Sequence, residues 1–348
     1  RTPPSPVQRP VGHDDPMTSA IADALRLPAG PVDLTAIDPD SAPGFDGKKA
    51  DGKAALAGMQ PELADLQERL WAERTAGSER RVLLVLQGMD TSGKGGVLRH
   101  TIGLVDPQGV RITSFKAPTE EERSHDFLWR IERALPEAGY VGVFDRSHYE
   151  DVLIARVRSL IDTDRLDKRY DAINAFEQRL VDEGTVVVKC MLHISHEKQE
   201  ERLLERLDKP EKHWKFNPGD LDERAHWPAY REAYEIALER TGTDIAPWHV
   251  VPADKKWFRN LAVGQILLDT LRGLDLQWPV ADFDVAAETA RLAAEREPGS
   301  DRTIAGRQAG AQVQPRAAGR GVGGQLVRQA RIEGRNGSSR FALTVPFL

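Results

Sequence analysis

The sequence predicts an α/β fold in which a five-stranded parallel sheet lies between helices, a three-layer α/β/α arrangement. Short apolar runs alternate along the chain with longer segments of helical periodicity, which is typical of parallel strands joined by helical crossovers. The first apolar run leads into a glycine-rich loop, and the third leads into a cluster of charged residues. Because such loops meet at the carboxyl ends of the strands in an open α/β sheet, we expect both to line one crevice.

The five expected strands are the apolar runs at residues 82–86, 110–115, 140–144, 185–194 and 248–252. The expected helices lie at residues 61–74, 93–104, 119–135, 149–161, 168–183, 195–207 and 254–274, with a further aromatic helix that begins at Trp227. Thr119 and Glu122 have the spacing of a capping box at the start of the third of these helices. Residues 1–55 are expected to be irregular, because prolines interrupt their weak apolar groups.

The composition is that of a globular protein from a reducing compartment. The chain has 348 residues, of which 40% are hydrophobic and 29% charged, enough for one large or two ordinary domains. Its single cysteine, Cys190, cannot form an internal disulfide. No apolar stretch approaches the length of a membrane span, and residues 1–6 lack the apolar segment of a signal peptide. We therefore expect a cytoplasmic protein with no membrane partner.

Charge is distributed unevenly along the chain. The net charge is −6, but residues 299–348 contain eight arginines, no lysine and two acidic residues, so this part carries +6 and the rest about −12. The tail has no helical or strand period, and Ile332–Arg335 resembles an engineered protease site. We interpret residues 285–348 as a basic, disordered or non-native extension, the alternative being a functional basic arm. Residues 1–16 are interpreted as a non-native leader, with Met17 as the natural start.

The glycine-rich loop has the spacing of a phosphate-binding loop, the Walker A motif. Gly88 to Lys94 match the pattern G-x-x-x-x-G-K. Two glycines let the backbone turn sharply and approach an anion, the next helix offers its positive N-terminus, and Lys94 adds a cation. A glycine-rich turn with an accidental lysine is the alternative. The residues expected to contact phosphate or nucleotide here are Gly88, Met89, Thr91, Ser92, Gly93 and Gly95.

One position departs from the ordinary loop of this type. A Ser or Thr usually follows the lysine and binds Mg²⁺ through its hydroxyl group, but Gly95 follows Lys94 here. A metal must therefore take its protein ligands from elsewhere, and Asp90 inside the loop is the first candidate. A carboxylate beside bound phosphates makes sense when a cation lies between them.

The charged cluster begins with Asp145, directly after the third apolar run. Phosphate-loop enzymes hold a metal-binding carboxylate at this place, the Walker B position. Arg146 follows and could contact phosphate through two parallel hydrogen bonds. The alternative is an ordinary helix N-terminus in which Asp145 is the cap and Glu150 and Asp151 favour the helix dipole. Both roles are compatible, and we expect Asp145 to bind the metal.

A cationic segment lies between the fourth and fifth expected strands. Its basic residues are Arg202, Arg206, Lys209, Lys212, His213 and Lys215. Nucleotide kinases carry a closing lid at this place, so we expect a lid at about residues 201–242 whose cations bind phosphate. A solvated charged helix face is the alternative. His193, at the end of the fourth run, could face the site or be a core histidine.

These motifs together resemble those of the family-2 polyphosphate kinases. The resemblance covers roughly residues 27–279 and rests on the stretches Gly88–Gly96, Phe115–Thr119, Phe144–Leu153, His213–Asp220 and Val251–Trp257. It implies a thymidylate-kinase-like fold for a domain at residues 56–284. It also implies reversible, Mg²⁺-dependent phosphoryl transfer between inorganic polyphosphate and nucleotides.

The resemblance assigns roles to particular residues. Asp90 and Asp145 match the family's metal-binding and nucleophile-orienting aspartates, and Gly95 is a family trait. Lys116 and the lid cations could line a channel for the polyanion. The catalytic residues implied in this way are Asp90, Lys94, Asp145, Arg146 and Arg206.

The signals for the acceptor nucleotide conflict. Lys116–Thr119 and His213–Asp220 resemble family members that phosphorylate both AMP and ADP, whereas Gly95-Gly96 resembles members confined to diphosphates. A channel of repeated phosphate contacts would let a nucleotide slide by one phosphate. We therefore predict that AMP is converted through ADP to ATP, with broad purine tolerance, by a homo-oligomer that binds no specific nucleic acid.

Two other functions compete with this prediction. An ATP-dependent nucleoside or nucleoside-monophosphate kinase would use ATP as the donor, and the lid cations and Gly95 argue against it. A nucleic-acid-binding protein would act through the arginine-rich tail and would lose affinity steeply with salt.

Overall fold

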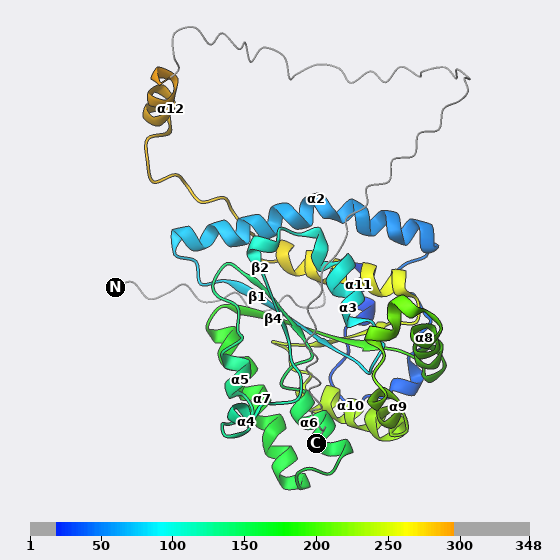
Figure 1. Ribbon diagram of the computed structural model, residues 1–348. Coiled ribbons are helices and arrows are strands. Elements are labelled where there is room, and N and C mark those ends of the chain that lie inside the picture. Colours follow the sequence, from blue (N-terminus) through cyan, green and yellow to red (C-terminus); the bar gives the residue numbers. More distant parts are fainter. Residues whose placement is uncertain (1–18, 296–348) are drawn as a thin grey trace, which may run out of the picture. The chain divides into compact units, whose positions relative to one another are not determined.

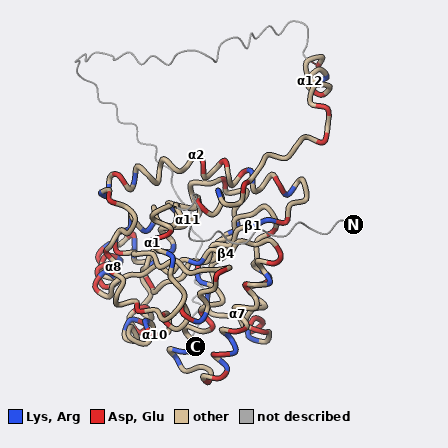
Figure 2. Tube along the Cα trace, turned by 180° about the vertical axis from the view of Figure 1, so that it is seen from behind, with Lys and Arg blue, Asp and Glu red and all other residues tan. Residues whose placement is uncertain are grey.

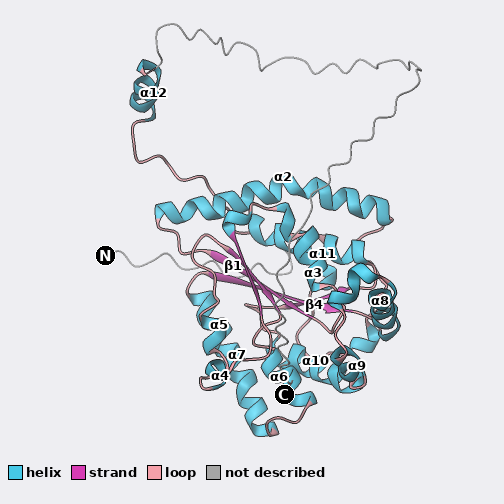
Figure 3. Cartoon of the chain, in the orientation of Figure 1, coloured by secondary structure: helices cyan, strands magenta, loops and turns pink. Residues whose placement is uncertain are grey.

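Five parallel strands form the centre of the structure, a computed structural model that describes residues 19–295 (Figure 3). The strands are β1 (Arg81–Gln87), β2 (Val110–Ser114), β3 (Val141–Asp145), β4 (Thr185–His193) and β5 (Trp248–Pro252). They are arranged in the order β2-β3-β1-β4-β5, and every neighbouring pair is parallel. The predicted five-stranded parallel sheet is therefore confirmed.

Helices cover both faces of this sheet (Figure 1). The helices that pack on one face are α1 (Ala20–Leu25), α2 (Lys49–Glu73), α3 (Lys94–His100) and α11 (Lys256–Arg272). Those on the other are α6 (Glu150–Val157), α7 (Thr163–Asp182) and α10 (Trp227–Thr241). Successive side chains of a strand point to opposite faces, so Leu84 and Leu86 of β1 join the first core and Leu83 and Val85 the second.

The remaining short helices lie in the connections and at the end of the described region. They are α4 (Glu120–Arg123), α5 (Trp129–Glu132), α8 (His196–Asp208), α9 (Gly219–Arg224) and α12 (Val285–Ala294), with 3-10 turns at Leu34–Ala36, Arg74–Ala76, Ile102–Leu104, Pro107–Gly109 and Pro210–Lys215. Ser195 caps α8 as expected, since its hydroxyl accepts the Lys198 N–H at 3.0 Å. The chain divides into two units between Asp282 and Phe283, and α12 belongs to the second.

The N-terminal part contains more helix than expected. The prediction that residues 1–55 are irregular is wrong, because α1 and the first turns of α2 lie within them. Helix α2 begins at Lys49 and continues through Pro61, although a proline removes one backbone hydrogen bond inside a helix. The helix packs along α11 and buries Leu63 and Leu70 completely, and this burial offsets the lost bond.

The prediction of one continuous helix at residues 119–135 is also wrong, because the structure has two short helices there, α4 and α5. The capping box at its start is present, with the Glu122 N–H donating to Thr119 Oγ1 at 3.2 Å. The helical conformation is interrupted before α5, where the Asp126 carboxylate accepts the Leu128 N–H at 3.0 Å. Such a local side-chain bond competes with continuation of the helix.

Several predictions lie at or beyond the limits of the described residues. The proposed leader at residues 1–16, the start at Met17 and the arginine-rich part at residues 299–348 fall outside them. Among the helices within residues 19–295, none is long and apolar enough to cross a membrane.

Candidate active site

The glycine-rich loop and the charged cluster lie side by side at the carboxyl ends of β1 and β3. The strands pair in register, with Leu86 of β1 opposite Asp145 of β3. The loop between β1 and α3 follows immediately, and the Arg146 N–H donates to Leu86 O at 3.1 Å. The two motifs therefore lie at the same edge of the sheet, as the sequence predicts.

The loop adopts backbone conformations that require its glycines. Gly88 and Gly93 have φ angles of 145° and 110°, which side-chain-bearing residues rarely adopt, and Thr91 is left-handed with a φ of 62°. The Gly88 N–H donates to the Tyr234 hydroxyl at 3.1 Å, and Lys94 Nζ lies back over the loop, 2.7 Å from Gly88 O. The loop is thus a closed turn with its lysine folded over it.

An ion pair joins the two motifs directly. Arg146 Nη2, in the turn after β3, donates to Asp90 Oδ1, in the loop after β1, at 2.8 Å. Arg146 holds a left-handed backbone with a φ of 64°, a strained conformation for a non-glycine residue that is common at functional sites. Asp145 is half-buried, and its nearest donor is Ser114 Oγ at 3.5 Å. Both predicted aspartates therefore lie beside Arg146, and within residues 19–295 each has one carboxylate oxygen that accepts no hydrogen bond.

The turn that carries Arg146 is anchored in the core. Gln87 Nε2 donates to Ser147 Oγ at 3.1 Å, which ties the turn to β1. Tyr149 donates to Glu177 Oε1 at 2.7 Å, and Lys189 Nζ lies 2.6 Å from Glu177 Oε2. These buried contacts connect the turn to α7 and β4 and hold Arg146 in its unusual conformation.

The charges at the site change the proton affinities of its members. Burial lowers the pKa of Lys94, and the nearby Arg146 lowers it further, while Asp90 and Asp145 oppose this shift. Burial also lowers the pKa of Arg146, but the charges of Glu150 and Asp90 outweigh it and raise that pKa above its ordinary value. The two aspartates thus raise the pKa of both basic groups and favour their charged forms.

Glu150 is a member of this cluster that the sequence interpretation did not assign to the site. Its pKa is raised by burial, against the lowering effect of Arg146 and Lys94. We interpreted it only as a residue that favours the helix dipole. Its place in the stretch Phe144–Leu153, five residues after Asp145, was the available signal.

The carboxylates present fit a divalent cation that also binds substrate phosphates. Among residues 19–295 there is no group of three or more His, Cys, Asp or Glu side chains that would hold a metal by itself. Mg²⁺ is usually bound through one or two carboxylates, several waters and substrate phosphates rather than by an all-protein cage. Asp90 and Asp145 are the two carboxylates that would hold a cation in this way.

The lid cations are held by carboxylates in this structure. Arg206 Nη1 lies 3.1 Å from Asp220 Oδ2 and also donates to Lys215 O at 2.9 Å. Lys209 and Lys212 both bind Glu205 Oε1, at 2.8 and 2.6 Å, and lower the pKa of Glu205 to about 2. Acidic residues outnumber basic ones along α8 (Figure 2). Three of the cations expected to bind phosphate are thus paired with carboxylates: Arg206, Lys209 and Lys212.

Three predicted residues occupy other surroundings. The Arg202 guanidinium is turned inward and donates to backbone carbonyl groups behind the loop. His193 is 9% exposed, its Nε2 lies 3.1 Å from Ile37 O, and burial lowers its pKa, so it is a core histidine. Lys116 follows Phe115, whose N–H donates to Asp145 O at 3.0 Å, and it lines a hollow of about 390 Å³ beside β2.

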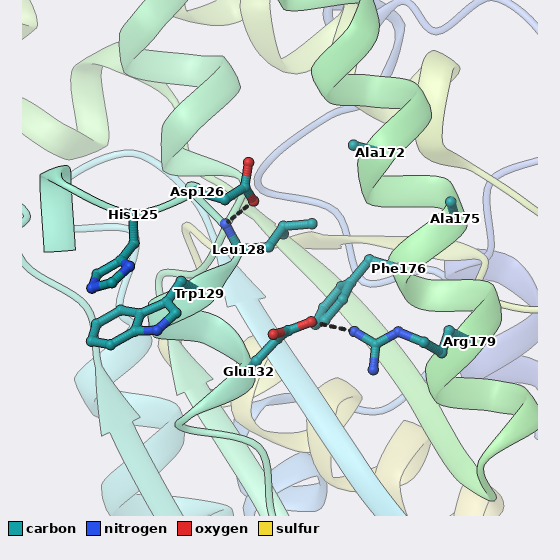
Figure 4. Close-up of a pocket in the computed structure, with 9 residues that line it drawn as sticks. All are labelled: His125, Asp126, Leu128, Trp129, Glu132, Ala172, Ala175, Phe176 and Arg179. Carbon is teal, nitrogen blue, oxygen red and sulfur yellow. Dashed lines mark hydrogen bonds and ion pairs between the residues drawn. The ribbon is translucent and has the colours of Figure 1, made fainter.

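A larger hollow of about 720 Å³ lies apart from these motifs (Figure 4). It is lined by α5, the turn before it and α7, and it contains none of the predicted site residues. His125 stacks on Trp129 with ring centroids 4.1 Å apart, and Glu132 pairs with Arg179. Of its charged side chains, Glu132 and Arg179 bind each other, and Asp126 accepts the Leu128 N–H.

An all-parallel sheet, a phosphate-type loop after β1 and a carboxylate at the end of β3 define a phosphate-loop phosphotransferase. The family model described as polyphosphate kinase 2 (PPK2) matches residues 46–278, two thirds of the chain. The chain belongs to this family, and the resemblance seen in its motifs is confirmed.

Relatives and a solved structure agree with this assignment. The chain is 48% identical over 252 residues to the AMP/ADP-polyphosphate phosphotransferase of Meiothermus ruber, a match that covers 72% of this chain and 93% of the relative. It is 43% identical over 229 residues to the ADP-polyphosphate phosphotransferase of Rhodopseudomonas palustris, covering 62% and 78%. The crystal structure of polyphosphate kinase 2 from Arthrobacter aurescens TC1 superposes with a TM-score of 0.78 at 57% identity, covering 80% of this chain and 98% of that one.

Proposed function

We propose that this enzyme transfers phosphoryl groups between inorganic polyphosphate and purine nucleotides, with Mg²⁺ as its cofactor. The observation that carries the proposal is the contact between Asp90 of the glycine-rich loop and Arg146 at the end of β3, at 2.8 Å. It brings anion-binding and cation-binding groups to one crevice. The names of the relatives, which include polyphosphate transfer to AMP and to ADP, supply the substrate class.

The residues of the site suit this reaction because phosphoryl transfer depends on positioning and charge neutralisation. Loop amide groups, Lys94 and Arg146 bind the phosphates on either side of the transferred group. Asp145 orients the attacking phosphate oxygen of the nucleotide. Asp90 and Asp145 would hold Mg²⁺, which would supply charge neutralisation at the transferred group, and the Asp90 carboxylate would replace the hydroxyl ligand that Gly95 lacks.

The lid supplies cations when it closes over the polyanion. In this proposal phosphate oxygens replace Asp220 on Arg206 and replace Glu205 on Lys209 and Lys212. The observed ion pairs support such an exchange, since each cation is partly exposed and its partner is a single carboxylate. Lys116 and Lys215 extend the cationic path.

Acceptor use follows from the repetitive nature of these contacts. Cations that bind phosphates in any register let a nucleotide enter with one phosphate or with two. We therefore expect conversion of AMP through ADP to ATP. The relatives include proteins named for both acceptors and proteins named for ADP alone, so the acceptor range must be measured for this chain.

The test is a time course with polyphosphate, Mg²⁺ and AMP, with the products separated by ion-exchange chromatography. ADP should rise first and ATP later, and GMP should behave similarly. If AMP stays untouched while ADP is converted, dual acceptor use is wrong. A parallel reaction with ATP in place of polyphosphate is the control, and faster transfer from ATP to AMP would favour the nucleoside-monophosphate kinase instead.

A further inference from the structure

Two arginines lie behind the glycine-rich loop, on the side away from the crevice. Arg202 comes from α8 and Arg259 from α11, and they are 6% and 3% exposed. Within the described part of the chain, neither forms an ion pair with a carboxylate, whereas most other arginines there do. Burying a charge without a counter-charge is costly, so these two cations require an explanation.

The two guanidinium groups converge on one peptide unit. Arg202 Nη1 donates to Thr91 O at 2.8 Å and to Ser92 O at 3.2 Å. Arg259 Nη1 donates to the same Ser92 O at 3.2 Å, and its other nitrogens bind Asn260 Oδ1. The other end of Arg202 binds Ala253 O, so the pair fastens the loop to the β5–α11 turn.

Glycines make this close approach possible. A Cβ atom at Gly93 would overlap Arg259 Nη1, and a Cβ atom at Gly96 would overlap Arg259 Nη2. A Cβ atom at Gly95, by contrast, would meet nothing within 4 Å. Gly93 and Gly96 therefore serve the contact with Arg259, in addition to any contact with phosphate.

The orientation of this peptide determines what faces the crevice. The protein has no cis peptide bond among its described residues, so the Ser92 carbonyl and the Gly93 N–H point in opposite directions. Two cations hold the carbonyl from behind, and the Gly93 N–H donates to no atom of residues 19–295. A free amide at the start of α3 is the group that binds a phosphate oxygen.

We propose that Arg202 and Arg259 are positioning residues that present the Gly93 N–H to the substrate and add positive charge behind the loop. Their charge is unfavourable in the free enzyme and becomes favourable once the polyanion is bound. The inference rests on the proposed function, because it takes polyphosphate as the anion in the crevice. Arg202 and Arg259 thus form a second layer of cations, behind the residues that contact the substrate.

Arg259→Gln removes one charge and leaves a shorter side chain of similar polarity. Titration calorimetry should show roughly tenfold weaker binding of tripolyphosphate. The variant lacks the guanidinium group that binds Ser92 O, and it lacks one positive charge near the bound anion. The increase in Tm caused by tripolyphosphate should shrink accordingly. Arg259→Lys keeps the charge but not the forked geometry, so it should recover part of the affinity, to within about threefold of the wild type.

Arg272→Gln is the matched control. It removes the same charge from the same helix, but Arg272 binds Glu62 in an ion pair remote from the loop contacts. Its affinity for tripolyphosphate should equal that of the wild type. This comparison separates a local effect behind the loop from a change in net charge.

The outcomes distinguish this inference from the proposed function. Wild-type turnover of polyphosphate tests the function, and its absence rejects the function whatever the arginine variants do. If the wild type is active and the folded Gln variant binds tripolyphosphate as tightly as the wild type, with only its Tm lowered, Arg259 is merely structural and the inference is overturned. If the Gln variant of Arg259 does not fold, Arg202→Gln replaces it, because Arg202 donates to the same Ser92 O, and unchanged affinity for tripolyphosphate in that variant overturns the inference equally.

Discussion

Replacing Gly93 by alanine is predicted to damage both the stability and the activity of the enzyme. Gly93 has a φ of 110°, and an alanine held there costs about 1–3 kcal/mol of backbone strain. Its Cβ atom would also overlap the Arg259 guanidinium, which is buried and cannot move aside freely. Displacing Arg259 loses a charge-assisted hydrogen bond to Ser92 O, worth about 1.5–3 kcal/mol.

We therefore expect Gly93→Ala to lower the free energy of unfolding by about 2.5–6 kcal/mol, measured by urea denaturation. Turnover of polyphosphate should fall with it, because the displaced peptide no longer presents its N–H. Gly58→Ala is the control: Gly58 is exposed in α2 with nothing near its Cβ position, so this change should stabilise the protein by about 0.5–1 kcal/mol. A Gly93→Ala enzyme within about 1 kcal/mol of the wild type and fully active would refute the reasoning.

Three further predictions follow from other contacts. Arg206→Ala should lower turnover at least about tenfold while Tm changes little, because an exchangeable ion pair contributes about 0–1 kcal/mol to stability. Lys198→Ala on the same helix is the control. A fall in Tm of many degrees would show that Arg206 is structural. Lys189→Met should lower the free energy of unfolding by about 3–5 kcal/mol in urea, because it leaves the fully buried Glu177 carboxylate without its cation, and an unchanged value would contradict this. Burial raises the pKa of Cys190 to about 12 from 9.0, so the native protein should resist thiol alkylation at pH 8. The protein should also lose stability as the pH rises above 9, because the thiol of the unfolded chain ionises first. Rapid alkylation of the native protein would exclude this burial.

Much of the fold could be predicted because its signals are local. Each strand is a continuous apolar run, as expected for strands buried on both faces, and each run ends near the residue where the structure ends the strand. Asp90 and Asp145 could be assigned to one crevice because both follow strands of the same parallel sheet. The start of α8 could be predicted because Ser195 is a strong cap.

The remaining features depend on tertiary contacts that the sequence does not display. Pro61 suggested a helix start, but burial against α11 carries α2 across it. Arg202 lies in a run of cations whose other members face solvent, and nothing in its spacing shows that it alone turns inward to bind Thr91 O. Nothing in the sequence singles out Arg259, because its partner in the loop, Ser92 O, lies 167 residues earlier in the chain.

The central claim is that the carboxylates of Asp90 and Asp145, with Arg146 between the two motifs, form the site of phosphoryl transfer. It is tested most directly by the rate of ATP formation from polyphosphate and ADP, measured against Mg²⁺ concentration for the wild type and for Asp145→Asn. We expect Asp145→Asn to keep the circular dichroism spectrum and the Tm of the wild type, and to turn over roughly a hundredfold or more slowly. Near-normal turnover with an unchanged dependence on Mg²⁺ would contradict it.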